Sequence, residues 1–315
     1  MVFFECLGLH TAGCLPKHEV CSEMTGRRLI LFWFVLVGFC SQARSQYFYV
    51  SDVNGVDMFN SLGLKISTFS VPNADGLAFD PAGDLFVASG SGVITKIDPN
   101  GVSSIFASGS ALGDPEGLAF DNLGNLYVAS HLDGTIVKIT PDGTQSAFAS
   151  FTQGTGDQYY GLAFSSVTGD LYATAGLGIY QFTLSGTRTL IAQIPGAGPI
   201  AIDSLGNIYV SGDDNNIYRI TPVGGVVTPF ALNAHASGLT FDSNGNLYAA
   251  NRLNGSIDQY NAVGVATTFI PGMSDPTFIV SGPAVPEPST EVLAGFGLIG
   301  LAFARQLFRA RVGAW

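Results

Sequence analysis

The sequence predicts an all-β fold built from repeated units, and its composition and its periodicity are the observations behind that prediction. The chain has 315 residues, of which 47% are apolar and only 12% are charged, with 40 Gly and 15 Pro. Little charge combined with many glycine and aromatic residues favours short strands and tight turns over exposed helices. The composition excludes a disordered chain, which would combine low hydrophobicity with high charge.

One sequence motif recurs five times along the middle of the chain. It reads DGLAFDPAGDLFVAS, EGLAFDNLGNLYVAS, YGLAFSSVTGDLYAT, PIAIDSLGNIYVS and SGLTFDSNGNLYAAN, and these copies start at Asp75, Glu116, Tyr160, Pro199 and Ser237. Their aligned positions are spaced by 41, 44, 38 and 39 residues and are Gly76, Gly117, Gly161, Pro199 and Gly238. A period near 40 residues with four strand-like runs per unit is typical of a β-propeller blade.

The second copy shows the four predicted strands of one blade. GLAFD is strand A, LYVAS strand B, TIVKI strand C and QSAFAS strand D, with turns at NLGN and TPDG. Apolar and aromatic residues dominate strands A and B, whereas strand C is mixed. This pattern fits inner strands that are buried on both faces and outer strands that are half exposed.

The two ends of the repeat region complete the ring. Residues 47–70 match strands B, C and D without a strand A, and residues 275–282 match a strand A with nothing after it. Together they make a sixth blade, which closes the ring and hides its sheet edges. We therefore expect a six-bladed β-propeller over residues 46–284, its last blade closed by strands from both termini. We also expect a signal helix before it and a hydrophobic helix after it.

The repeat resembles NHL-type six-bladed propellers and the related gluconolactonase superfamily over about residues 46–282. The resemblance is specific for architecture and says little about activity, because one propeller scaffold carries many functions.

The amino-terminal segment has the pattern of a secretory signal peptide at residues 24–45. Arg27 and Arg28 form a positive region, an apolar run covers residues 29–39, and small residues precede a cleavage point before Gln46. A twin-arginine signal and a lipoprotein signal at Cys40 fit less well. Residues 1–23 then precede the expected start at Met24 and are interpreted as a misassigned beginning.

That upstream segment offers one competing interpretation, a zinc site. Its spacing superficially resembles a zinc ligand set formed by Cys6, His10, Cys14, His18 and Cys21. A misassigned start is the favoured interpretation. All four cysteines precede the expected cleavage point, so the mature chain would contain no thiol and no disulfide.

The two faces of the predicted propeller differ in how much they vary between repeats. The A–B turns are nearly uniform (DPAGD, DNLGN, DSLGN, DSNGN), and we assign their Asp to turn capping rather than to calcium binding. The opposite face varies, so any binding site should lie there. Its candidate residues are Asp52, Asp75, Glu116, His131, Tyr160, Asp213, Asp214, His235, Asn251 and Arg252.

Two enzyme alternatives follow from family resemblance. The gluconolactonase resemblance implies a carboxylate-and-Asn metal site at the channel mouth, for which Glu116, Asp213 and Asn251 are the local match, with Ca²⁺ or another divalent cation as ligand. The chain also resembles streptogramin lyases, which implies a glutamate and clustered histidines. The mature domain offers only His131 and His235 for that role. We expect no other cofactor.

The charge balance excludes nucleic acid as a partner. Residues 46–284 hold six basic and 19 acidic residues, a net charge of −13, which would repel phosphates. Protein, neutral glycan and cation binding are all compatible with this surface.

The carboxy-terminal tail, residues 285–315, completes the assignment. Pro286, Glu287 and Pro288 precede an apolar run at residues 292–304, and basic residues follow at Arg305, Arg309 and Arg311. This order resembles the PEP-CTERM sorting signal. The resemblance implies a transient membrane anchor, processing by an exosortase-type membrane protease, and delivery to the cell surface or an extracellular polysaccharide matrix.

Taken together, the sequence favours an exported, non-catalytic propeller that binds a protein or a glycan. A metal-dependent lactonase-like hydrolase is the alternative, and a streptogramin-lyase-like enzyme comes after it.

Overall fold

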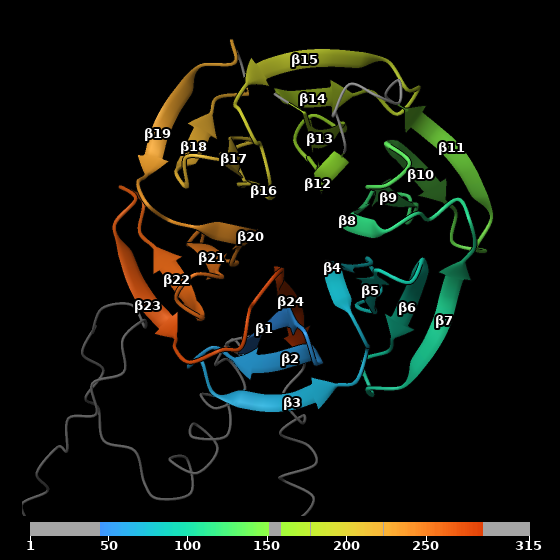
Figure 1. Ribbon diagram of the computed structural model, residues 1–315, viewed down its shortest axis with the longest axis horizontal. Helices are drawn as coiled ribbons and strands as arrows, with labels where there is room; N and C mark the ends of the chain where they lie inside the picture. The colour runs from blue at the N-terminus through green and yellow to red at the C-terminus, as the bar shows by residue number, and fades with distance from the viewer. Residues whose placement is uncertain (1–44, 151–158, 177, 223, 286–315) are drawn as a thin grey trace, which may run out of the picture. The chain divides into compact units, whose positions relative to one another are not determined.

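Six four-stranded antiparallel sheets are arranged around a central axis (Figure 1). The computed structural model describes residues 45–150, 159–176, 178–222 and 224–285. Within these ranges the regular structure consists of strands alone. This confirms the all-β, six-bladed propeller predicted from the repeat.

Each sheet is one blade, with strands A to D running from the axis to the rim. The closing blade and the first two complete blades contain β24 (Ile279–Val285), β1 (Ser45–Asp52), β2 (Gly55–Asn60) and β3 (Lys65–Phe69); β4 (Ala74–Phe79), β5 (Leu85–Ser89), β6 (Val93–Ile97) and β7 (Ser103–Ser108); and β8 (Pro115–Phe120), β9 (Leu126–Ser130), β10 (Thr135–Ile139) and β11 (Gln145–Ser150). The other three contain β12 (Tyr159–Phe164), β13 (Leu171–Ala175), β14 (Gly178–Phe182) and β15 (Arg188–Gln193); β16 (Ile200–Ile202), β17 (Ile208–Ser211), β18 (Ile217–Ile220) and β19 (Val227–Ala231); and β20 (Ala236–Phe241), β21 (Leu247–Asn251), β22 (Ser256–Tyr260) and β23 (Ala266–Ile270).

The core lies between neighbouring blades. Strands B such as β5 and β9 are buried at all five residues, whereas the outer strand β7 is mostly exposed. Phe86 of one blade makes edge-to-face contacts with Phe106 of the same blade and Phe120 of the next, at ring-centroid distances of 4.9 and 4.8 Å. Such aromatic pairs add to the apolar burial that holds adjacent blades together.

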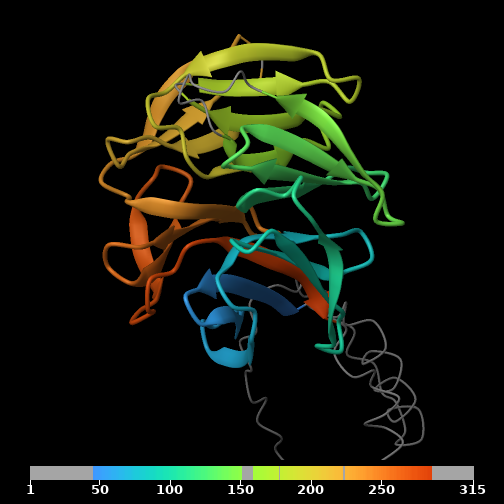
Figure 2. The same ribbon diagram turned by 45° about the vertical axis from the view of Figure 1, so that its right-hand side comes forward.

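The closing blade joins the two ends of the propeller. β24 pairs antiparallel with β1, with Tyr49 opposite Val280, and the blue and red strands lie side by side in Figure 2. Side-chain oxygens of Ser51 and Thr277 lie 2.9 Å apart in a hydrogen bond, although 226 residues separate them in sequence. Pairing the two ends in one sheet removes two open strand edges.

The repeat glycine marks the closest approach of inner strands. A Cβ built on Gly76 would lie 1.6 Å from the carbonyl oxygen of Glu116 in the next blade, and one on Gly117 would lie 2.4 Å from the carbonyl oxygen of Tyr160. Only glycine leaves room for these backbone contacts. The glycine therefore recurs because inner strands meet there, next to the residues that line the channel mouth.

The uniform Asp residues cap the A–B turns. Oδ1 of Asp80 accepts hydrogen bonds from the backbone N–H groups of Ala82 and Asp84, both at 2.9 Å, and Asp121 makes the same pair with Leu123 and Asn125. The turn chemistry expected for these positions is thus present.

The predicted signal peptide and sorting tail lie outside the described residues, apart from their junctions at Ser45 and Val285. The expected signal helix and hydrophobic helix fall in the same undescribed segments. In the part of the chain that the structure describes, no helix is long and apolar enough to cross a membrane.

Candidate functional site: the acidic channel mouth

The propeller has two faces with different chemistry. In the first complete blade, the pair Phe79–Leu85 flanks the A–B turn and the pair Ala74–Ser89 lies at the other end, beside the B–C loop. We call the face with the A–B and C–D turns the turn face. We call the opposite face, with the B–C loops and the D–A connections, the loop face.

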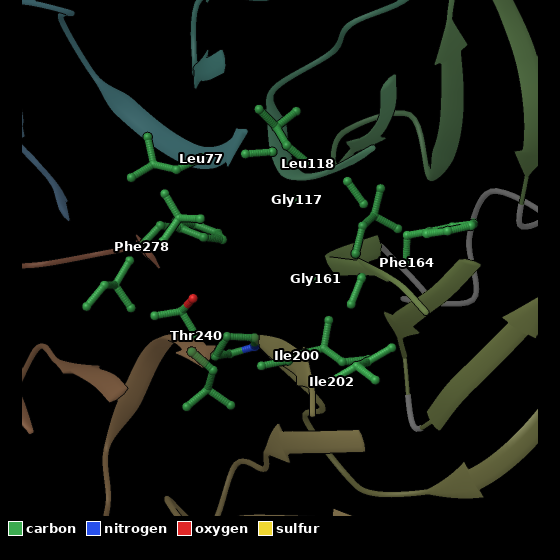
Figure 3. Close-up of a pocket in the computed structure, with 18 of the residues that line it drawn as sticks. Leu77, Gly117, Leu118, Gly161, Phe164, Ile200, Ile202, Thr240 and Phe278 are labelled. Carbon is green, nitrogen blue, oxygen red and sulfur yellow. The ribbon is translucent and has the colours of Figure 1, made fainter. Parts of the chain in front are cut away.

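The inner strands surround an apolar channel (Figure 3). Its cavity has a volume of about 360 Å³ and is lined by side chains such as Leu77, Leu118, Ile200 and Phe278. Thr240 is the one polar side chain among the described lining residues, and its hydroxyl accepts a hydrogen bond from the backbone N–H of Ser281. The wall of the channel therefore offers a ligand almost no side-chain hydrogen-bonding group.

Three carboxylates gather at that mouth. Asp75 and Glu116 directly precede the repeat glycines of β4 and β8, and Asp114 lies in the connection that leads into β8. Burial, and then the charge of Asp114, raises the pKa of Asp75 to about 6, while Arg252 acts in the opposite direction. Burial, and then the charges of Asp75 and Asp114, raises the pKa of Glu116 to about 8. Glu116 is therefore mainly protonated at neutral pH.

His131 and Tyr160 flank Glu116. Nδ1 of His131 lies 3.7 Å from Oε2 of Glu116, and the rings of His131 and Tyr160 are 4.7 Å apart between centroids. This Nδ1 is buried and has no hydrogen-bond partner within the structure. Burial and the neighbouring Glu116 raise the pKa of the Tyr160 hydroxyl. A carboxyl, an imidazole and a phenol thus converge at one edge of the mouth.

Arg252 lies in a connection of the loop face. The other five Lys and Arg residues of the described propeller all lie on C and D strands. Nη2 of Arg252 donates to Oδ2 of Asp275 at 2.7 Å, and its Nε donates to the other carboxylate oxygen. The pairing neutralises much of its charge and leaves the mouth acidic.

Sequence reasoning missed Asp114 and Asp275. Both lie in a connection that leads into an inner strand, both are followed by Pro, and both adopt a positive φ, of 55° and 57°. The backbone carbonyl of Asp114 also accepts the N–H of His131 at 3.0 Å, which ties the two loops together. The recurring Asp-Pro was the available signal, because Asp tolerates the left-handed region better than most residues.

Three predicted residues serve the loops themselves. Asp52 accepts backbone N–H groups of Asn54 and Gly55 at 2.7 and 3.2 Å. Asp214 accepts hydrogen bonds from Asn216 and Tyr218. Nδ2 of Asn251 donates to Oδ2 of Asp258 at 3.0 Å, and its Oδ1 accepts the N–H of Asn254 at 3.1 Å.

Asp213 and His235 lie in connections of other blades. The backbone N–H of Asp213 donates to the carbonyl of Pro195 at 3.0 Å, and that of His235 donates to Asn215 at 3.2 Å. Neither residue is among the groups that perturb the Asp75–Glu116 pair. The predicted candidates thus divide into a mouth cluster (Asp75, Glu116, His131, Tyr160, Arg252) and loop residues (Asp52, Asp213, Asp214, His235, Asn251).

The suggested metal set of Glu116, Asp213 and Asn251 comes from three different blades. The amide of Asn251 is engaged with Asp258 and Asn254, and the charged neighbours of Glu116 are Asp75 and Asp114. Among the described residues, no group of three or more His, Cys, Asp or Glu side chains is arranged to hold a metal ion. Divalent-cation binding stays a prediction.

Solved structures with similar folds share little sequence with this chain. A chain of a nidogen/laminin complex is 18% identical with a TM-score of 0.66, over 76% of this chain and 99% of that one. A streptogramin B lyase is 18% identical with a TM-score of 0.61, over 76% and 84%. A protein of unknown function from Bacteroides caccae is 13% identical with a TM-score of 0.61, over 76% and 99%. At such identities the likeness shows the fold alone.

Curated proteins include no match to this sequence. A family model for the PEP-CTERM protein-sorting motif matches residues 284–306. The chain carries a PEP-CTERM sorting motif. It starts within β24, so the sorting tail follows directly from the closing blade. The PEP-CTERM motif indicates export, a membrane-associated tail and recognition by an exosortase.

Proposed function

We propose that this exported propeller is a binding protein that takes a cationic partner at its acidic mouth. The observation that carries the proposal is the convergence of Asp75, Asp114 and Glu116 above an apolar channel. The partner class is a basic segment of an extracellular protein or an amine-bearing polysaccharide. The favoured location is the cell surface or an extracellular polysaccharide matrix, after exosortase processing of the tail.

The raised pKa values make the mouth responsive to a cation. Desolvation and mutual repulsion hold Glu116 in its neutral form, with a pKa of about 8. An incoming positive charge favours the ionised carboxylates and so recovers the energy that repulsion costs. Cation binding at the mouth should therefore be coupled to loss of the Glu116 proton and should strengthen as the pH rises.

The test is direct binding of an oligolysine peptide to the purified protein by calorimetry. We expect binding by the wild-type protein and a loss of about tenfold in the double variant Asp75→Asn/Glu116→Gln, because two carboxylates of the site are removed. Asp142→Asn is the matched control, since Asp142 is an exposed carboxylate of a C–D turn on the other face. Equal affinity of all three proteins would show that the mouth is not the binding site.

A general acid–base enzyme is the second candidate. The observation that favours it is the placement of Glu116, His131 and Tyr160, with 3.7 Å between the carboxylate and the imidazole nitrogen. In this proposal the protonated Glu116 donates its proton to a leaving group and the imidazole of His131 accepts one from the substrate. This candidate corresponds to the lyase-like alternative, whereas the lactonase-like alternative also requires a divalent cation.

The enzyme candidate is tested by product analysis with quinupristin, a compound bound to a virginiamycin B lyase in one similar structure, and with simple lactones. Turnover that disappears in both Glu116→Gln and His131→Gln would support it. Turnover that persists in both variants, or no turnover by the wild-type protein, would count against it. Elemental analysis of the same samples tests the divalent-cation prediction.

A further inference from the structure

Exposed aliphatic side chains project from the tips of the turns on the turn face. Leu62, Leu123, Leu205 and Val263 each stand directly before a glycine with positive φ, at the same position of four turns. Their exposed fractions are 76%, 75%, 72% and 77%. Polar residues and glycine usually dominate such turn positions, whereas these four turns share an exposed aliphatic side chain. We call these four residues the turn tips.

The closing blade directs the sorting tail toward the same face. Val285, the last residue of β24, pairs with Ser45, the first residue of β1. The B–C loop at residues 53–54 lies at the opposite end of β1. The end of β24 is therefore equivalent to the A–B turn end of the other inner strands. Leu62 and Leu64 belong to the C–D turn of this same blade and are 76% and 60% exposed.

The link between the blade and the apolar part of the tail is short. Residues 286–291 separate β24 from the apolar run that begins at Val292 within the sorting motif. Six residues span at most about 20 Å even when fully extended. A membrane that holds the apolar run therefore lies close to the turn face.

Among the described residues, the turns of this face carry carboxylates, such as Asp98 and Asp142, and no Lys or Arg. The carboxylates of Asp80, Asp121 and Asp203 accept backbone N–H groups of their own turns. Nζ of Lys96 lies 2.5 Å from Oδ2 of Asp84. A surface of this kind offers little attraction to anionic headgroups, which favours zwitterionic lipid as the surface in contact.

We propose that the turn face is a membrane-contacting surface. While the tail holds the protein, the turn tips enter the headgroup region of a zwitterionic bilayer, and the loop face points away from it. Four separate aliphatic groups bury too little area to bind lipid firmly by themselves, but tethering greatly raises their effective concentration at the surface. The proposal depends on the sorting motif and is independent of the mouth's ligand.

The experiment places one fluorophore on either face of the full-length protein in phosphatidylcholine vesicles. Cys6, Cys14, Cys21 and Cys40 are changed to Ser, and a polarity-sensitive label is attached to Leu205→Cys or to Leu253→Cys. The two sites are matched, because Leu205 on the turn face and Leu253 on the loop face are 72% and 69% exposed. Only vesicle-bound protein recovered by flotation is measured, with and without lipids that carry a headgroup nitroxide.

We expect quenching at position 205 to exceed that at position 253 by about threefold, because the nitroxide acts only over short range in the headgroup region where apolar groups insert. Equal quenching at both sites, stronger quenching at 253, or none at either would overturn the proposal. Shielding of the label from water without lipid quenching would also overturn it, since that result indicates contact between copies of the protein.

A second pair of variants tests the turn tips without placing the label on one of them. With the label on Ser204→Cys, we expect the double variant Leu62→Asp/Leu123→Asp to lose most of the lipid quenching. The matched loop-face double variant Leu132→Asp/Leu253→Asp should retain it. An equal loss in both would contradict a role for the turn tips.

Discussion

At the residue scale, Glu116 shows how the fold creates chemistry that its sequence motif does not display. The residue occupies the position before a repeat glycine, where the close approach of β4 and β8 places it beside Asp75. Burial and two neighbouring carboxylates together raise its pKa to about 8. The same crowding that keeps Glu116 neutral is a cost to folding once the group must ionise.

We predict that this cost is visible in the pH dependence of stability. The folded-state pKa of Glu116, about 8, lies above its ordinary value of 4.5, so the folded protein binds this proton more tightly than the unfolded chain. The contribution of Glu116 to stability should therefore be full below about pH 4.5, decrease as the pH rises, and level off above about pH 8. Glu116→Gln stays neutral, so its melting temperature should exceed that of the wild-type protein above pH 8 by about 2–4 °C.

Thermal melts of both proteins between pH 4 and pH 9 check this prediction. Asp142→Asn serves as a control, because the hydroxyl of Thr140 and other hydrogen bonds lower the pKa of Asp142. That variant should not gain stability at high pH. Parallel curves for wild-type protein and Glu116→Gln would contradict the assigned environment of Glu116.

At the element scale, the inner strands decide how closely the blades pack. A Cβ on Gly76, inside β4, would meet the backbone of Glu116, whereas the nearest atom to a Cβ on Gly198, just before β16, is the side-chain oxygen of Ser211 at 3.3 Å. Neither glycine is among those with a positive φ. A difference between alanine substitutions at the two positions therefore reports the close approach of a neighbouring strand, and not a requirement for positive φ.

Replacing these glycines by alanine should have unequal effects. Gly76→Ala forces a Cβ against a backbone carbonyl and should cost about 3 kcal/mol or more of unfolding free energy. Gly198→Ala needs only a small shift of one side chain and should change it by less than about 1 kcal/mol. Urea denaturation of both variants measures the difference. Similar losses would mean that the repeat glycine is not retained for packing.

At the scale of the whole molecule, the repeat made the fold predictable and left the site only partly so. The spacing of Gly76 and its counterparts predicted blade number, strand order and the closing of β24 on β1, because each reflects a local pattern repeated in sequence. Asp75, Glu116 and His131 were found by their loop positions. The partners Asp114 and Asp275 depend on contacts between loops, and the hydrogen bond of Asn251 with Asp258 joins β21 and β22. A repeat pattern encodes neither kind of contact.

The closing blade and the tail have separable roles at this same scale. A chain ending at Val285 keeps β24 and should melt within about 2 °C of the full chain, but it should fail to reach its normal destination because the sorting motif is lost. A chain ending at Ser274 loses β24, leaves the inner edge of β1 open, and should be destabilised by several kcal/mol. Melting curves and cell fractionation compare the two. Unfolding of the longer truncation would contradict a purely sorting role for the tail.

Proton release on binding tests the central claim, a cation-binding mouth at Asp75 and Glu116, most directly. Calorimetry of oligolysine binding at pH 7, in two buffers of different ionisation enthalpy, reports the protons exchanged. Because the pKa of Glu116 is about 8 in the free protein, a bound cation should drive its proton off. The account predicts proton release that disappears in Glu116→Gln, together with affinity that rises between pH 6 and pH 8. Binding without proton release and with no dependence on pH over this range would contradict it.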